Sequence, residues 1–454
     1  MIVKAIFSNI LSFDTPTEIN FIAGAAKSWP DQVSRDNKRD SYPVLKTSLI
    51  LGPNGAGKSN VCKCIELIQN IAIGDFHESY LQPFKLGSEI TDKSEISITI
   101  KTEGKFYEYS VSFNVSQILK ESLYAVNIRS RKKIYEREFV NERYEYSWGI
   151  INGKENDRLF IDFVSNGTPS DDSFLHEYVH RNGKGLDDIK NVYNWFLHKL
   201  TVIFPDSKFK SLPMALRKDN EFSNRLCKLL RYFNTGVNNV KMEEVDFDNV
   251  KISTMEKKKL LETFKRNPDS MITMDSPSMK YFFEVKDNKV QSSRLVTEHY
   301  NILHHPVNFG LDEESDGTLR LLDILPILID FQDSDSVYLV DEIDRSLHPK
   351  MTEAILEYYF HLFSSDKDTQ LICTTHEAYL LDEKKLRPDQ FWFIRNNKGA
   401  SKFSSLGTRR LRKVVMKSYL DGDFKAVPEF DDKLLRESLP EEYRGKDFFD
   451  EDYE

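Results

Sequence analysis

Hydrophobic and polar positions alternate at the start of the chain and then give way to a helical spacing. Residues 1–7 alternate as in a strand, and the apolar run at 48–51 predicts a second strand that is buried on both faces. Residues 60–68 follow with apolar positions three to four apart, which predicts a helix. The first 70 residues or so therefore read strand, loop, strand, short loop and helix.

The middle and the end of the chain carry both kinds of spacing. Residues 96–113 alternate on either side of a short turn, which predicts a β-hairpin. Residues 185–270 show helical periodicity without sustained heptads, so we expect helices but no long coiled-coil arm. Residues 274–309 return to alternation. Residues 317–395 then read helix, strand, helix, strand, helix, strand, the order of a parallel sheet with crossover helices.

Composition places the chain among ordinary globular proteins. Its 454 residues are 40% hydrophobic and 30% charged, enough for two domains or for one domain with a large insertion. No run approaches the roughly 18 apolar residues of a membrane span, and residues 1–7 lack the cleavage site of a secretory peptide. We therefore expect a cytoplasmic protein without a membrane partner. The four cysteines lack paired metal spacing and are interpreted as buried or inert thiols.

The net charge of −9 argues against a surface that coats nucleic acid uniformly. Local basic patches at 129–133 and 409–413 keep nucleic acid open as a partner, although each is first interpreted as a solvated face or a protein contact. Residues 447–454 are acidic and aromatic and are interpreted as a frayed tail or a docking segment.

A complete phosphate-binding loop lies between the strand at 48–51 and the helix at 60–68. Its pattern, G-x-x-x-x-G-K-S, lets successive backbone N–H groups curl around phosphates while the helix directs its positive dipole end at them. Lys58 is expected to reach the β- and γ-phosphates, and Ser59 is expected to hold magnesium. The implied cofactors are ATP and Mg²⁺. The residues predicted to contact the nucleotide are Gly52, Asn54, Gly55, Gly57, Lys58, Ser59 and Asn60.

A second group of candidate residues follows two later strands. The apolar run at 336–340 ends in Asp341 and Glu342, which predicts a metal-ordering aspartate and a carboxylate that activates water. Acidic residues after a strand are also typical of helix caps, so the assignment of this pair depends on the other motifs found with it. The strand at 370–375 leads into His376, which can hydrogen-bond a γ-phosphate. We interpret Asp341, Glu342 and His376 as catalytic, with Asp341 also as a metal ligand.

A turn of small and acidic residues, 314–318, opens a helix over 319–329 and by itself is only an N-cap. The phosphate loop, this turn, the Asp-Glu strand, the Asp loop and the histidine nevertheless stand in the order found in ATP-binding-cassette ATPases, which the chain resembles. The resemblance implies that Asp344 of the Asp loop contacts the nucleotide. It also implies that Gln82 is a glutamine-loop metal ligand.

In the cassette ATPases the signature turn of one subunit completes the nucleotide site of another. Ser315 and Gly317 match the serine and second glycine of that signature, so the resemblance implies that they bind nucleotide in a homodimer or higher homo-oligomer. Asp316 and Thr318 depart from the transporter form of the signature. This departure counts against a transporter subunit.

Within that superfamily the chain resembles the AAA15 or overcoming-lysogenization-defect-like ATPases, especially the abortive-infection L-type and restriction-linked ATP-binding proteins. Related nucleases carry a further nuclease domain, whereas only about 60 residues follow Ile394 here. The resemblance therefore implies an ATPase that acts with a separately encoded effector, commonly a nuclease, in defence against phage, and that responds to a phage-derived trigger. The stretches that carry the resemblance are 9–13, 82–84, 314–318, 341–349 and 419–428.

The fold expected from these features is α/β. It consists of a P-loop ATP-binding-cassette ATPase head, with a mixed or parallel sheet flanked by helices, and a large, mostly helical insertion that contains the hairpin. The head is assigned to residues 1–75 and 301–400, the inserted lid or arm to 76–300, and a C-terminal extension to 401–454.

Two other classes of ATPase share the same nucleotide motifs. A DNA repair ATPase of the structural-maintenance or RecF-like kind would need a long coiled-coil arm or stimulation by DNA. A transporter subunit would need a surface for membrane helices and a closer signature match. The missing heptads count against the first of these classes.

Residues 176–180 match H-E-x-x-H, a spacing that places two imidazoles on one helix face for zinc. The residues that follow, 181–185, end the helix, and no further histidine or glutamate occurs before His198. We interpret His176 and His180 as surface or interface residues rather than as a metalloprotease site.

Overall fold

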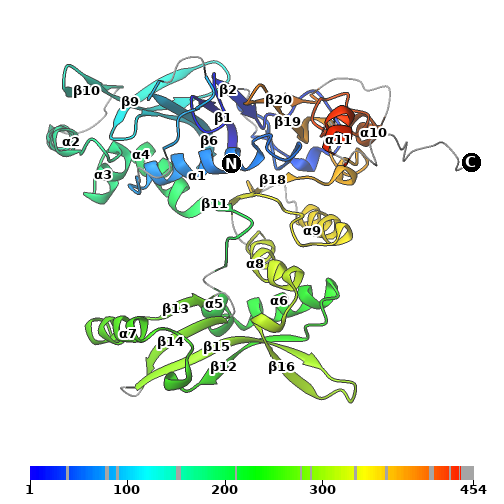
Figure 1. The fold of residues 1–454 in the computed structure, drawn as a ribbon. Helices are drawn as coiled ribbons and strands as arrows, with labels where there is room; N and C mark the ends of the chain where they lie inside the picture. The colour runs from blue at the N-terminus through cyan, green and yellow to red at the C-terminus, as the bar shows by residue number, and fades with distance from the viewer. Residues whose placement is uncertain are drawn as a thin grey trace, which may run out of the picture.

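The computed structural model has an upper body and a lower lobe (Figure 1). The upper body carries the N-terminus and the last described helices, and the lower lobe contains the strands from β12 to β16. Helix α8 (Asp316–Asp330) and the segment that follows strand β11 (Leu200–Ile203) run between them. The structure describes residues 1–36, 40–76, 81–87, 91–149, 155–209, 212–276, 279–286, 289–331, 335–362, 367–407, 414–428, 431–438 and 440.

A six-stranded sheet in the upper body has the order β11-β17-β18-β5-β19-β20 and is parallel except for its last strand. Strand β5 is buried along its whole length, as its continuous apolar run predicts. The parallel sheet expected from residues 317–395 is confirmed, and β5 and β11 join it from earlier in the chain. The further bounds are β5 (Thr47–Leu51), β17 (Val337–Val340), β18 (Gln370–Thr375), β19 (Phe391–Asn397) and β20 (Ala400–Ser405).

The other sheet of the upper body has seven antiparallel strands in the order β10-β9-β8-β7-β6-β1-β2. The predicted hairpin is confirmed as β6 and β7. The sequence does not predict β8 to β10, because charged residues such as Lys120 and Glu138, which pair across the sheet at 2.9 Å, mask their alternation. The strands are β1 (Ile2–Ser8), β2 (Thr17–Asn20), β6 (Ser94–Thr102), β7 (Lys105–Phe113), β8 (Ile118–Val126), β9 (Arg131–Val140) and β10 (Arg143–Trp148).

Helix α1 (Lys58–Ala72) packs between these two sheets. Its apolar side chains, among them Val61 and Ile65, join residues of both sheets in one buried cluster. The buried side chain of Gln370 also ties the sheets together, because it accepts a hydrogen bond from the N–H of Ile2 at 2.7 Å and donates one to the carbonyl of Ile2 at 3.0 Å. All four cysteines are buried and free, which confirms their interpretation as buried thiols.

The region 76–300 is richer in strands than the sequence predicts and does not form one mostly helical insertion. Strands β6 to β10 extend the antiparallel sheet and β11 joins the parallel sheet, so only the part from α5 onwards builds the lower lobe. Local patterns cannot reveal this pairing, because the partners of β11 lie more than 100 residues away. The helices that stay with the upper body are α2 (Glu155–Gly167), α3 (Phe174–His180) and α4 (Asp187–Asn194), continued by a π-helical turn (Trp195–Lys199).

The lower lobe contains a sheet in the order β12-β15-β14-β13, with β16 paired to β15. Strands β14 to β16 confirm the alternation seen at 274–309. A second buried cluster joins α6 and α8 to β17 and β18 of the upper body. The elements are β12 (Asn239–Val245), β13 (Ile272–Ser276), β14 (Met279–Lys286), β15 (Lys289–Tyr300), β16 (Pro306–Gly310), α5 (Leu212–Lys218), α6 (Asn220–Tyr232) and α7 (Thr254–Arg266).

The longest helices in the described part of the chain, α1 and α8, have 15 residues each, so these residues form no long coiled-coil arm. Within the same part, no helix combines the length and the hydrophobicity needed to cross a membrane. The remaining elements are β3 (Val33–Ser34), β4 (Val44–Leu45), α9 (Pro349–His361), α10 (Val415–Leu420) and α11 (Asp432–Ser438).

Candidate nucleotide-binding site

The phosphate loop connects β5 to α1 and requires glycine for two reasons. Gly55 and Gly57 adopt positive φ values of 74° and 104°, which side chains other than glycine rarely tolerate. A Cβ on Gly57 would lie 2.1 Å from Oγ of Ser401, and a Cβ on Gly52 would lie 2.3 Å from the carbonyl oxygen of Ile394. The backbone can therefore pass close to its neighbours while Asn54 and Gly55 stay exposed at the tip of the loop.

Two serines that the sequence analysis did not single out support this loop. The hydroxyl of Ser401 donates to the carbonyl of Ala56 at 2.6 Å, and the amide of Asn60 donates to Oγ of Ser12 at 2.7 Å. Ser12 and Ser401 are themselves hydrogen-bonded, Oγ to Oγ, at 2.6 Å. Asn60 thus supports the loop, and its predicted contact with nucleotide stays a prediction. The sequence indicated this pair only in that Ser12 lies within 9–13, one of the stretches that carry the family resemblance.

Lys58 is the first residue of α1, and its side chain turns back into the loop. Its ammonium group donates to the carbonyls of Gly52 at 2.7 Å and Pro53 at 3.1 Å. Burial lowers the pKa of Lys58 to about 8, while the nearby carboxylates of Glu342, Asp341 and Asp344 oppose this shift. A cation held among loop carbonyls and carboxylates at a helix N-terminus is suited to a polyphosphate.

The two carboxylates lie directly after β17. Asp341 is buried, and its Oδ1 accepts a hydrogen bond from the hydroxyl of Thr374 at 2.6 Å. The same hydroxyl accepts from the N–H of Glu342 at 2.8 Å. Glu342 adopts a φ of 49°, a left-handed conformation that turns the chain sharply at the end of the strand. Thr374, which the sequence analysis missed, therefore fixes both predicted carboxylate residues.

His376 follows β18 and faces the same site. Its Nδ1 lies 3.3 Å from Nζ of Lys58, and its Nε2 lies 3.9 Å from Oε1 of Glu342. Burial and the neighbouring charge of Lys58 lower the pKa of His376, so the imidazole is neutral at pH 7. A neutral imidazole can donate one hydrogen bond and accept another.

Asp344 joins the group through its Oδ2, which accepts from the backbone N–H of His376 at 3.4 Å. Its Oδ1 is buried and has no hydrogen-bond partner among the described residues. Such an acceptor is suited to a water molecule or to a polar group of a ligand. The structure thus brings together the phosphate loop, Asp341, Glu342, Asp344 and His376.

Ser315 and Gly317 lie elsewhere, at the start of α8. Ser315 is exposed and caps the helix, because its hydroxyl accepts from the N–H of Thr318 at 3.1 Å. A Cβ on Gly317 would lie 2.9 Å from the carbonyl oxygen of Ser346, so the turn packs closely on the Asp loop of its own chain. Among the described residues, no hydrogen bond links Ser315 or Gly317 to the phosphate loop.

Gln82 has an exposed side chain, and its carbonyl accepts from the N–H of Leu11 at 2.7 Å. Leu11 precedes Ser12, which supports the phosphate loop. The segment is therefore linked to the loop, and the role of Gln82 as a metal ligand stays a prediction.

The residues present fit a magnesium nucleotide. The hydroxyl of Ser59 and the carboxylate of Asp341 supply the oxygen ligands that Mg²⁺ prefers. In the described part of the chain, no side chain caps the start of α1, whose N-cap residue is Gly57, and such a helix N-terminus is suited to a phosphate.

The H-E-x-x-H segment forms α3 and has a structural explanation. Nδ1 of His176 contacts Oδ2 of Asp172 at 2.8 Å, and Glu177 accepts from Nε of Arg181 at 2.5 Å. The ring of His176 also packs on Gly74, at the end of α1. Asp172, His176 and Glu177 lie near enough to one another to hold a metal ion, but the Asp172–His176 contact and the Glu177–Arg181 ion pair account for all three side chains without one.

One protein-family model matches the segment of the chain that contains this site. Residues 48–382 match the family described as "AAA domain, putative AbiEii toxin, Type IV TA system". No curated protein matches the chain. The matched segment runs from the strand before the phosphate loop to beyond His376, so it includes every catalytic residue predicted from the sequence.

Two solved structures show a distant likeness. The SMC head domain from Thermotoga maritima is 12% identical, with 89% of this chain and 98% of that chain covered and a TM-score of 0.38. An SMC head bound to the C-winged helix domain of ScpA is 14% identical, with 90% and 98% covered and a TM-score of 0.39. Similarity at this level supports no further conclusion.

The family match covers well over half of the chain, and the α/β architecture, the phosphate loop and the flanking helices agree with it. The chain therefore belongs to the AAA domain family described with the AbiEii toxin, and it is a P-loop ATPase.

Proposed function

We propose that the protein hydrolyses Mg-ATP at the site formed by the phosphate loop, Asp341, Glu342 and His376, and that it does so as a dimer. The observation that carries this proposal is the position of His376 between Lys58 and Glu342. Its Nδ1 lies 3.3 Å from Nζ of Lys58, and its Nε2 lies 3.9 Å from Oε1 of Glu342. These are the parts needed to hold a γ-phosphate and to activate water beside it.

Each residue has a separate role in this proposal. Lys58 and the backbone of the loop bind the β- and γ-phosphates, and His376 donates a hydrogen bond to the γ-phosphate. Glu342 polarises the attacking water, since its carboxylate projects from a turn fixed by Thr374. Ser59 and Asp341, with Gln82, would hold Mg²⁺, which when bound neutralises phosphate charge.

The second copy supplies Ser315 and Gly317. Ser315 is exposed and Gly317 is half-buried at the start of α8, away from the hydrogen bonds of their own phosphate loop, and a helix N-terminus is suited to a phosphate. Binding of ATP would therefore join two copies, and hydrolysis would release them.

The proposed biological role is a switch that controls a separately encoded effector, a nuclease, in prokaryotic defence against phage. The family description, which names a toxin of a toxin–antitoxin system, supports a role of this kind. The resemblance of the sequence to the overcoming-lysogenization-defect-like group supports the effector and a phage-derived trigger. In this proposal the protein acts in the cytoplasm. Recovery of the purified chain as a lone, constitutive nuclease would contradict it.

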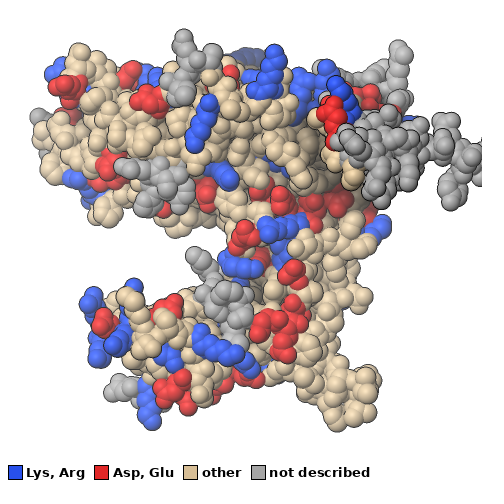
Figure 2. All heavy atoms as spheres, in the orientation of Figure 1, with Lys and Arg blue, Asp and Glu red and all other residues tan. Residues whose placement is uncertain are grey.

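A DNA repair ATPase remains the second candidate. Within the basic patch at 129–133, Arg129 pairs with Asp40 at 3.1 Å and Arg131 with Glu108 at 2.8 Å, which reduces the charge available to phosphates. Figure 2 shows basic and acidic side chains mixed over the visible face. Stimulation of hydrolysis by DNA would favour this candidate over the switch. The other basic patch, 409–413, lies outside the described residues.

The hydrolysis itself is tested by replacing Lys58. We expect Lys58→Met to reduce phosphate release by at least about 100-fold, because the cation that neutralises the leaving phosphates is lost. Lys63→Met, which changes an exposed lysine on the same helix, is the matched control and should stay within about twofold of the wild type. Equal rates for the two variants would contradict the proposal.

A further inference from the structure

Arg320 is a buried arginine that connects α8 with the turn carrying the catalytic carboxylates. It lies five residues after Ser315, and only 5% of its surface is exposed. Its Nη2 donates to the carbonyl oxygens of Asp341 and Glu342, each at 3.3 Å. Its Nη1 donates to the carbonyl oxygens of Phe204 at 3.3 Å and Pro205 at 3.4 Å, in the segment after β11.

These bonds act on a strained piece of backbone. Glu342 adopts a φ of 49°, a left-handed conformation that is unfavourable for a residue other than glycine and persists only when its surroundings hold it. Thr374 holds the N–H of Glu342, and Arg320 holds its carbonyl. The turn is therefore fixed from both sides, and the direction of the Glu342 carboxylate depends on both contacts.

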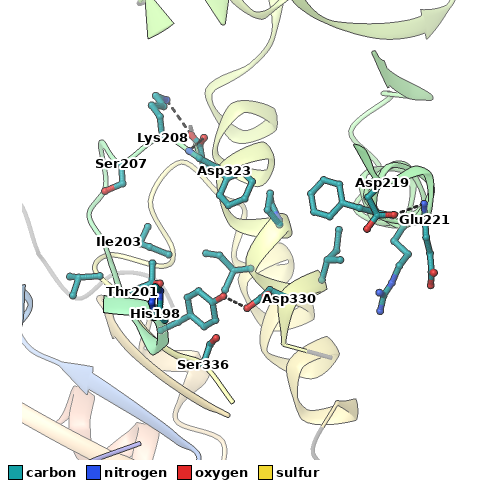
Figure 3. A pocket seen from close by; sticks show the side chains of 18 residues that line it. His198, Thr201, Ile203, Ser207, Lys208, Asp219, Glu221, Asp323, Asp330 and Ser336 are labelled. Carbon is teal, nitrogen blue, oxygen red and sulfur yellow. Dashed lines mark hydrogen bonds and ion pairs between the residues drawn. The ribbon is translucent and has the colours of Figure 1, made fainter. Parts of the chain in front are cut away.

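Apolar side chains of α8 pack on β17 and β18, and two cavities lie beside this packed contact. A cavity of about 860 Å³ lies between β11, α6 and α8, and Asp323 and Lys208 face each other across one part of it (Figure 3). A smaller cavity of about 200 Å³ is lined by Arg320, Arg345 and Asp316. At the start of α8, Arg320 adds a polar contact with the upper body through the carbonyls of Asp341 and Glu342.

We propose that Arg320 is a positioning residue for Glu342, and that it links the signature turn of each copy to the catalytic carboxylate of the same copy. The inference rests on the proposed function. When Ser315 and Gly317 engage nucleotide bound to a second copy, a shift of α8 would reach Glu342 through Arg320. Each copy would then hydrolyse its own ATP only when its signature turn is engaged.

The test compares Arg320→Lys and Arg320→Gln with the wild type. A single ammonium group cannot bond all four carbonyls that the planar guanidinium reaches, so both changes should loosen the turn. We expect kcat to fall by about 10- to 100-fold, with KM for Mg-ATP within about threefold, because the four carbonyl contacts do not involve the phosphate loop. If the glutamine variant does not fold, the lysine variant can still be measured.

Asp323→Asn is the matched control. Asp323 lies on the same helix, is 6% exposed, and accepts from the N–H of Phe209 at 2.9 Å and from Lys280 at 3.2 Å. It has no hydrogen bond with the turn at Asp341 and Glu342 among the described residues. This variant should lower the melting temperature as the Arg320 variants do, while its kcat stays within about threefold of the wild type.

A double variant separates positioning from a general loss of structure. If Arg320 acts through the Glu342 carboxylate, Arg320→Lys should cause no further loss of single-turnover rate in a Glu342→Gln background. Additive losses, or equal losses of kcat in Asp323→Asn and Arg320→Lys, would overturn the inference. Absence of hydrolysis by the wild type would instead overturn the proposed function on which the inference rests.

Discussion

The Nζ atom of Lys58 lies 3.3 Å from Nδ1 of His376, although 318 positions separate the two residues in the sequence. Sheet topology explains this meeting. Strands β17, β18 and β5 are neighbours and parallel, so their carboxyl ends meet at one edge of the sheet. The Asp-Glu turn, His376 and the phosphate loop follow these three strands in that order. Ligands bind at this edge in open α/β sheets.

Replacement of Gly57 by alanine should abolish nucleotide binding. The new Cβ would lie 2.1 Å from Oγ of Ser401, at a backbone φ of 104°. We expect the affinity for Mg-ATP to fall by at least about 100-fold, as the loop must move away from the helix N-terminus. Fluorescence titration with a labelled ATP analogue measures this change.

Gly104→Ala is the control for this substitution. Gly104 lies in the β6–β7 turn with a φ of 66°, and a Cβ there would have no atom within 4 Å. Its stability should fall by about 1 kcal/mol, the cost of a left-handed alanine, with the affinity for ATP unchanged. Equal affinities of the two variants would show that the tight approach at Gly57 has no role in binding.

Thr374→Val should slow hydrolysis without preventing binding. The substitution removes the hydroxyl that donates to Asp341 at 2.6 Å and accepts from the N–H of Glu342 at 2.8 Å. We expect kcat to fall by at least about tenfold and stability by about 1–3 kcal/mol, because a buried carboxylate loses a partner. Steady-state kinetics and thermal unfolding measure the two effects.

Thr375→Val changes the next residue of the same buried strand, whose hydroxyl accepts only from the N–H of Glu377 among the contacts described, at 3.0 Å. It should lose stability with a smaller loss of kcat. A kcat as low as that of Thr374→Val would mean that damage to β18, rather than the position of the carboxylates, limits the rate.

An ion-pair cluster between the two sheets should make stability depend on pH. Burial alone would raise the pKa of Asp368, but hydrogen bonds from Ser34 at 2.5 Å and Lys101 at 3.1 Å outweigh it and lower that pKa. A carboxyl whose pKa is lowered in the folded state stabilises the fold at any pH above its unfolded-state pKa of 3.8. This stabilisation is lost as the pH falls through the pKa of the folded state.

Asp368→Asn should therefore lower the unfolding midpoint at pH 7 and reduce the loss of stability between pH 5 and pH 3. The exposed Asp269→Asn is the control and should follow the wild-type curve. Thermal unfolding across this pH range measures the effect. If Asp368→Asn loses as much stability between pH 5 and pH 3 as the wild type, this cluster does not contribute to acid sensitivity.

Much of the upper body was predictable because the hydrophobic pattern of its strands and the residue types of its motifs indicate the same structure. The continuous apolar run of β5 and the glycines before α1 are strong local signals, and the carboxylates after β17 were assigned from the motifs around them; the structure brings all three together. The roles of Ser12 and Ser401 were not predictable, because each hydroxyl acts through a contact between segments almost 400 residues apart. Thr374 likewise stands within an apolar strand whose pattern gives no sign of its two hydrogen bonds.

The inserted region was predicted less well for a related reason. Helical spacing at 185–270 is local and indicated α4, α6 and α7 correctly. The place of β11 in the parallel sheet depends on pairing with β17, and the extension of the antiparallel sheet depends on charged cross-strand pairs. Both kinds of pairing join residues that are far apart in the sequence, and the periodicity of a short segment cannot reveal them.

Size-exclusion chromatography with light scattering on Glu342→Gln measures whether two copies hold ATP between them. Loss of the carboxylate should prevent water activation, lower the hydrolysis rate by at least about 100-fold and leave binding intact. We expect Mg-ATP to shift this variant to the mass of a dimer or higher assembly, whereas Ser315→Arg with Glu342→Gln should stay monomeric. A Glu342→Gln protein that remains a monomer at saturating Mg-ATP would contradict the account.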